Sequence, residues 1–103
     1  MPQYLVLIRP TRPEMLVTST PEEDRVVGEH FDYLKCLAAE GIVLMAGRTL
    51  NDDPSSFGII VFVADSEAAA ARRMNEDPAV VAGVFRAELY PYRVALASSG
   101  ILE

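Results

Sequence analysis

The stretch SFGIIVFVA, residues 56 to 64, decides the fold, because it is an almost unbroken run of branched and aromatic apolar residues. Such a run is typical of a strand in the interior of a sheet. A second run of this kind, QYLVLIR at residues 3 to 9, stops at Pro10. Strands with one face in water alternate apolar and polar residues. We therefore expect both faces of these two strands to be covered, as in the central strands of one sheet.

The first helix is predicted between these two runs. Thr20-Pro21-Glu22-Glu23 has the pattern of a capping box with proline at the first helical position. The helix should run to about Glu40 and stop at Gly41. The segment 10–20 before it is long for a compact domain, so we expect it to be a lid or a pocket wall.

Two strands and a second helix complete the pattern. IVLMAGR at 42–48 predicts a strand that forms an antiparallel hairpin with 56–64. Asp65, alone or with Ser66, is expected to cap a helix that ends near Asn75. A short turn leads to FRAELYPYRV at 85–94, whose alternation predicts a half-exposed edge strand.

The order β-α-β-β-α-β predicts a ferredoxin-like α+β domain over residues 1–95, an antiparallel sheet with two helices on one face. Residues 96–103 are expected to be a C-terminal tail. Two helices cover only one face of the sheet, although both central strands are apolar throughout. We infer that a second copy covers the open face, which predicts a homodimer with two-fold symmetry.

Composition excludes several classes of function. The net charge is −6 and the nine basic residues are scattered, so neither nucleic acid nor an anionic membrane is expected as a partner. No apolar stretch is long enough to span a bilayer, and the N-terminal run lacks the features of a secretory signal. The single Cys36 has no partner for a disulfide, which favours a cytoplasmic protein. With one histidine and no acidic cluster at ligand spacing, neither a metal nor another cofactor is expected.

His30 is the only histidine, and a helical wheel places it on the apolar side of the first helix together with Phe31. An imidazole that faces the sheet needs a polar partner. It is either a core histidine bound to a carbonyl or a base held by a carboxylate. Asp65 and Asp77 lie at helix starts beside the sheet, and Asp77 before Pro78 also has the pattern of an N-cap.

The segments GEHFDYLKCLAAEGIVLMAGR and FGIIVFVADSEAAAARRMNEDPAVVAGVFRAELYPYR together resemble the YCII-related (YciI-like) family over about residues 3 to 93. The resemblance implies a dimeric α+β barrel and an active site with a His-Asp dyad, which maps onto His30 and Asp77. In place of the proline of the family's AGP-like segment this chain has Arg48. That residue is either a cation at the pocket mouth or a solvated strand end.

The resemblance points to cofactor-free proton chemistry, since the few assigned relatives are linked to lactone isomerisation or dehydrohalogenation. We expect a lyase or isomerase for a small organic anion, with Tyr33, Tyr90 or Tyr92 as pocket donors or as packing residues. A second hypothesis is a tautomerase-like role for Pro2 after removal of Met1. A third is a non-catalytic dimeric module for ligand binding or assembly, in which His30 and Asp77 only secure the fold.

Overall fold

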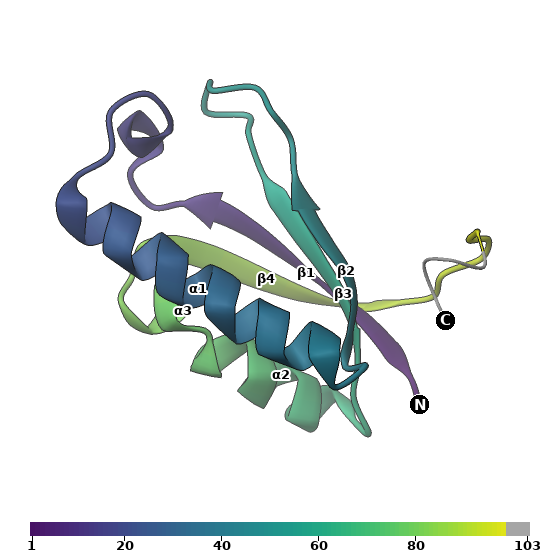
Figure 1. The fold of residues 1–103 in the computed structure, drawn as a ribbon. Coiled ribbons are helices and arrows are strands. Elements are labelled where there is room, and N and C mark those ends of the chain that lie inside the picture. The colour runs from purple at the N-terminus through teal and green to yellow at the C-terminus, as the bar shows by residue number, and fades with distance from the viewer. Residues whose placement is uncertain (99–103) are drawn as a thin grey trace.

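The computed structural model describes residues 1–98 and shows one antiparallel sheet with its helices on one face (Figure 1). The strands are β1 (Gln3–Pro10), β2 (Val43–Arg48), β3 (Gly58–Val63) and β4 (Phe85–Tyr92). The helices are α1 (Pro21–Ala39), α2 (Glu67–Glu76) and the single turn α3 (Pro78–Val81), and a 3-10 turn, η1 (Pro13–Leu16), precedes α1. The strand order is β2-β3-β1-β4, which places β1 and β3 in the centre as predicted. The ferredoxin-like α+β fold is confirmed.

Local signals in the sequence account for the helix boundaries. The Thr20 hydroxyl accepts from the Glu23 amide and the Glu23 carboxylate accepts from the Thr20 amide, so the capping box is present. Gly41, with φ of 76°, follows the end of α1 in the left-handed conformation that glycine adopts without strain. Ser66 rather than Asp65 caps α2, because the Ser66 hydroxyl accepts from the Ala69 amide. The expectation for Asp65 is therefore corrected.

The core lies between the sheet and the helices, and β1 shows how it is built. Tyr4, Val6 and Ile8 are buried, whereas the residues between them are half-buried. Because successive side chains of a strand point to opposite faces, the buried set faces the helices. On β3 their partners Phe62 and Ile60 are buried on the same face. The packing of these side chains fixes which residues of β1 and β3 lie opposite one another, and the geometry of the site depends on this register.

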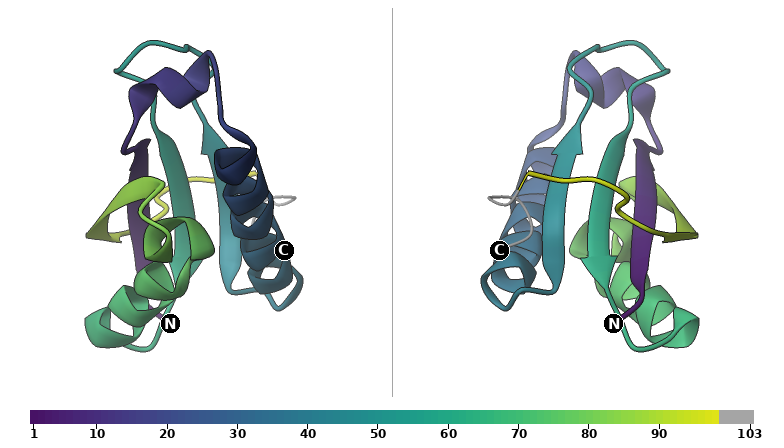
Figure 2. Two further views of the ribbon diagram at one scale, coloured as in Figure 1. Left: turned by 90° about the vertical axis from the view of Figure 1, so that its left-hand side faces the viewer. Right: turned by 90° about the vertical axis from the view of Figure 1, so that its right-hand side faces the viewer.

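The other face of the sheet carries no helix (Figure 2). Its central rows are Leu5 opposite Val61 and Leu7 opposite Ile59, and Met45 pairs with Val61 at the edge. Met45 keeps 43% of its surface exposed. After β4 the chain leaves the sheet, and the Val94 amide donates to the Gln3 side chain at 2.7 Å. This apolar sheet face is called the open face below.

Two other expectations need adjustment. The segment after Asp77, expected to be a turn, forms the helical turn α3. Phe31 was expected on the buried side of α1, yet it is 63% exposed. The reason is that Phe31 lines a cavity between α1 and the β2–β3 hairpin instead of packing on the sheet. Within residues 1–98 no helix is long and apolar enough to cross a membrane, and residues 99–103 of the predicted tail lie outside the described part of the chain.

Candidate active site

A buried histidine–aspartate pair lies at the centre of the candidate site. His30, in the middle of α1, is 9% exposed, and Asp77 is 3% exposed. The imidazole Nδ1 lies 2.7 Å from Oδ2 and 2.9 Å from Oδ1 of Asp77. A carboxylate accepts hydrogen bonds, so the geometry assigns the ring proton to Nδ1 when the ring is neutral. The Nε2 atom then carries the free lone pair.

Asp77 holds this position because it also organises the backbone around it. It ends α2 and is the N-cap of α3, and its Oδ1 accepts a hydrogen bond of 2.9 Å from the Ala79 amide. Pro78 then occupies the first helical position, where no amide proton is needed. The sequence left open whether Asp77 is a cap or the partner of His30. The structure shows that one carboxylate makes both sets of contacts.

Phe85 packs against the imidazole from the side. The two ring centroids are 5.1 Å apart and the planes meet at 82°, which is an edge-to-face arrangement. Phe85 is the first residue of β4, so the sheet supports the ring from below while Asp77 holds one nitrogen. The imidazole is thus restrained in both tilt and rotation.

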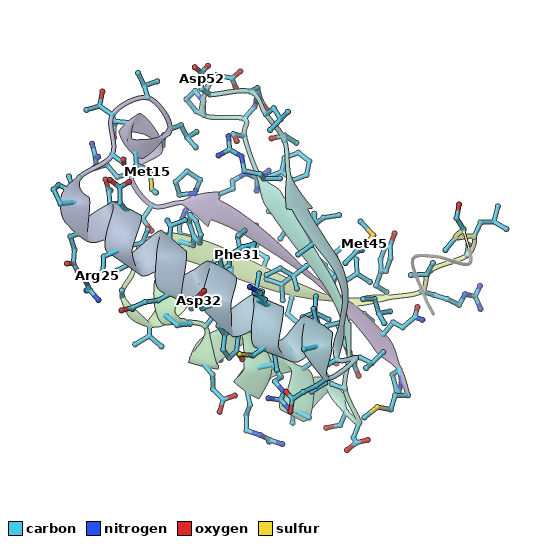
Figure 3. The ribbon with its side chains drawn as sticks, in the orientation of Figure 1. Met15, Arg25, Phe31, Asp32, Met45 and Asp52 are labelled. Carbon is cyan, nitrogen blue, oxygen red and sulfur yellow. The ribbon has the colours of Figure 1, made fainter. Side chains whose placement is uncertain are left out.

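The histidine of this pair borders a cavity of about 760 Å³ between α1 and the β2–β3 hairpin. His30 lines this cavity and Asp77 does not, so the imidazole lies between the buried carboxylate and the cavity. Met15 and Leu16 of η1 close one end, which confirms the loop 10–20 as a wall of the pocket. Figure 3 shows Met15 and Phe31 on the side of α1 toward the hairpin, with Arg25 on the opposite side.

The η1 loop is fastened to α1 by one ion pair. The Arg12 guanidinium donates to Glu23 at 2.9 and 2.6 Å and to the Thr18 carbonyl at 2.9 Å. This contact, together with the Thr20 amide, lowers the pKa of Glu23 from 4.5 to about 2. The pocket wall is therefore tied to the N-terminus of the same helix that carries His30.

Arg48 faces the cavity because of an irregularity in β2. The pairing of β2 with β3 shifts between Val43 and Met45, which indicates a β-bulge. A bulge inserts one residue and reverses which side chains face which side of the sheet. Arg48 pairs with Gly58 and lines the cavity. Its Nε donates to the Thr49 carbonyl at 3.0 Å, and the side chain is exposed at the cavity rim.

The other residues named as site candidates lie elsewhere. Tyr33 donates to the Arg73 carbonyl at 2.8 Å between α1 and α2, and burial raises the pKa of its hydroxyl. Tyr90 lies on β4, 44% exposed, and donates to Glu88 at 2.7 Å, a hydrogen bond that raises its pKa. Tyr92 is also exposed on β4. None of these tyrosines lines the cavity, and neither does Pro2.

Sequence reasoning missed Ser56 and Phe57 as cavity residues. Ser56 is 3% exposed, and its hydroxyl oxygen lies 3.3 Å from the hydroxyl of Thr49. No motif marks Ser56, which lies two residues before β3, so only the fold could place it there. In the described part of the chain, no group of three or more histidine, cysteine, aspartate or glutamate side chains is arranged to hold a metal ion.

The fold and the buried pair define a ferredoxin-like α+β domain with a large cavity at its helix-bearing face. The chain belongs to the YCII-related domain family, whose model matches residues 3–93. Comparison with curated proteins finds no match. Among solved structures, the fold is similar to 5-chloro-2-hydroxyhydroquinone dehydrochlorinase (TftG) from Burkholderia phenoliruptrix AC1100, in complex with 2,5-dihydroxybenzoquinone. The TM-score is 0.63 at 21% identity, over 87% of this chain and 93% of that one.

Proposed function

We propose that this chain is a cofactor-free acid–base enzyme, a lyase or isomerase, that acts on a small organic anion. The observation that carries the proposal is that His30 is bound through Nδ1 to the buried Asp77 while the ring borders a large cavity. This arrangement is that of a general base with a residue that orients it.

The chemistry follows from the two ring nitrogens. Nε2 of neutral His30 takes a proton from a substrate carbon or hydroxyl, and the electron pair left behind forms an enolate or phenolate. Asp77 stabilises the imidazolium, which returns the proton at another atom in an isomerisation or releases it to solvent after a halide leaves. General base catalysis of this kind is worth roughly 10² to 10⁴ in rate. Among the side chains that line the cavity, Arg48, Lys35 and the Ser56 hydroxyl are potential donors to the developing oxyanion.

The solved neighbour supports the reaction class, because its name describes loss of chloride from a hydroxylated ring. Its likeness to this chain at 21% identity concerns the fold, so the substrate of this chain is argued from its own cavity.

The test is release of chloride from 5-chloro-2-hydroxyhydroquinone by the purified protein, compared with His30→Ala. We expect the variant to lose a factor of roughly 10² to 10⁴ in rate. Equal rates for the wild type and the variant, in this assay and in solvent deuterium exchange into the chlorine-free ring, would reject the enzyme proposal.

The second candidate is a non-catalytic ligand-binding or assembly module, which the N-cap contact of Asp77 to Ala79 favours. Under that reading the pair secures α3 against α1, and His30→Ala would cost several kcal/mol of stability. A residue kept for catalysis would instead leave the melting temperature unchanged or higher when it is replaced. Thermal unfolding of His30→Ala therefore separates the two candidates.

We also propose that two copies pair through the open face. Leu5, Leu7 and Ile59 on this face are only half-buried and are not covered by the chain's own helices, so a two-fold dimer would bury them further, whereas Val61 is already only 2% exposed. We retain a cytoplasmic location as a prediction, supported by the exposed, unpaired Cys36.

A further inference from the structure

The cavity is longer than one small ring. Its volume of about 760 Å³ lies in the range of sites that enclose drug-sized ligands, ~300 to 1,000 Å³. Along α1 its lining extends from Asp24 to Ala38, which is about 21 Å at the rise of a helix. Along β2 it extends from Val43 to Arg48, which is about 16 Å at the rise of a strand. A single six-membered ring covers only part of that length.

The walls favour a flat aromatic ligand over a flexible chain. Of the four phenylalanines in the sequence, Phe31, Phe57 and Phe85 line the cavity, and only Phe62 belongs to the core. Phe31 lies on α1, Phe57 directly before β3 and Phe85 at the start of β4, so they reach the cavity from three separate segments. The Arg9 guanidinium lies 5.9 Å from the centroid of the Phe57 ring. Phe31 is 63% exposed, which leaves its ring available for contact. Aromatic side chains pair with other rings by offset stacking or edge-to-face contact.

The polar side chains that line the cavity come from separate segments and are Ser19, Asp24, His30, Lys35, Arg48 and Ser56. His30 borders it from the middle of α1, whereas Arg48 lies at the end of β2, on the side where the β2–β3 loop approaches η1 (Figures 1 and 2). Within residues 1–98 the terminal nitrogens of Arg48 have no hydrogen-bond partner, because only its Nε donates, to Thr49. A guanidinium with both terminal nitrogens free suits a planar carboxylate or phenolate oxygen.

We propose that the cavity binds a flat aromatic anion of two or more fused rings, with its acidic oxygen on Arg48 and its ring system between the phenylalanines. This deepens the proposed function by naming the substrate class. The inferred substrate class depends on the proposed function only in that the bound anion would give up its proton to His30. The binding preference itself depends on the length and the aromatic walls of the cavity.

The experiment compares two probes with the same head group, 3-hydroxy-2-naphthoate and salicylate, which differ by one fused ring. The chain contains no tryptophan, so the fluorescence of the naphthoate can be followed without an indole background. We expect the naphthoate to bind at least about tenfold more tightly, because extra apolar atoms in a fitting pocket give discrimination of this order. Equal dissociation constants, or no saturation by the naphthoate at about millimolar concentration, would overturn the proposal.

Three variants locate the effect. Phe31→Ala should weaken naphthoate binding about three- to tenfold and change salicylate binding less, since one aromatic contact is lost. Val81→Ala is the matched control, because Val81 is 72% exposed on α3 and does not line the cavity. If Phe31→Ala leaves the naphthoate constant unchanged, or Val81→Ala lowers affinity equally, the cavity is not the binding site. Arg48→Gln should weaken both probes together.

His30→Ala separates this inference from the enzyme proposal. The variant should keep the naphthoate preference, because the ring stacking does not use Nε2. If the wild type binds the naphthoate more tightly than salicylate but catalyses no proton transfer, only the catalytic proposal is refuted. If the wild type catalyses proton transfer on single-ring substrates but binds the naphthoate no more tightly than salicylate, only this inference is refuted.

Discussion

His30 and Asp77 are 47 residues apart in the chain, yet their side chains meet at 2.7 Å between Nδ1 and Oδ2. Both side chains are nearly excluded from water, at 11% and 4% relative exposure. The contact joins the middle of α1 to the junction of α2 and α3. The direction in which Nε2 points is therefore a consequence of how these helices pack, and a change at either residue acts on the other.

Asp77→Asn should separate the cap from the dyad. The amide keeps an oxygen for the Ala79 N–H, so stability should fall by only about 1 kcal/mol. Its NH₂ group, however, faces Nδ1 and moves the ring proton to Nε2, so the base is lost and the rate should drop roughly 10² to 10⁴-fold.

Asp77→Ala is the comparison for that variant. It removes the cap as well, worth about 1 kcal/mol, and leaves Nδ1 unpaired. The free energy of unfolding in urea and the reaction rate, measured on both variants, separate the two roles of Asp77. An Asp77→Asn protein that keeps its rate, or one that unfolds as easily as Asp77→Ala, would contradict the assignment of two roles.

The Arg12–Glu23 pair should make stability depend on acid pH. Because the pKa of Glu23 is lowered from 4.5 to about 2 in the folded protein, the contribution of the pair is complete above pH 4.5 and is lost as the pH falls toward 2. Glu23→Gln keeps an acceptor for the capping box but carries no charge. The difference in melting temperature between wild type and this variant should close as the pH is lowered.

Arg12→Gln should behave in the same way, since it removes the other partner of the pair. Melting temperatures at several pH values between 5 and 2 are sufficient for the measurement. A difference that stays constant across this range would show that Glu23 is not held by Arg12.

Gly28 and Gly58 should respond oppositely to alanine. At Gly28 in α1 a Cβ would meet no atom within 4 Å, so Gly28→Ala should stabilise the protein by up to about 1 kcal/mol through helix propensity. At Gly58 in β3 a Cβ would lie 3.0 Å from Ile8 Cγ1 and 3.2 Å from the Gly47 carbonyl. Gly58→Ala should destabilise by about 1 to 3 kcal/mol, as measured by denaturant unfolding. Equal effects of the two substitutions would disprove this packing.

The open face should be sensitive to charge if it is a dimer interface. Leu7→Glu places a carboxylate in the middle of this apolar surface, and burying it against a second copy is costly. We expect the variant to sediment as a monomer at concentrations where the wild type is a dimer. Leu50→Glu in the β2–β3 loop is the control, because Leu50 is 88% exposed outside the sheet. A wild-type protein that sediments as a monomer would refute the interface.

Much of the fold could be predicted because its signals are local. The capping box at Thr20 and the stop at Gly41 each depend on a few neighbouring residues. The inward position of His30 follows from helical periodicity alone. Phe31 shows the limit of that reasoning, since a helical wheel assumes that the whole apolar side meets the sheet. Here a cavity lies between α1 and the β2–β3 hairpin, and Phe31 lines it.

The sequence by itself determined the order of the elements, their capping and the direction of the only imidazole, because hydrogen bonds and periodicity within a helix or strand need no distant partner. Only the tertiary structure decided that Asp77 meets His30, that a bulge turns Arg48 toward the cavity, and that Tyr33 and Tyr90 face other surroundings. These relationships depend on strand register and helix packing, which combine residues far apart in the chain. A shift of one residue in register reverses the face on which a side chain lies.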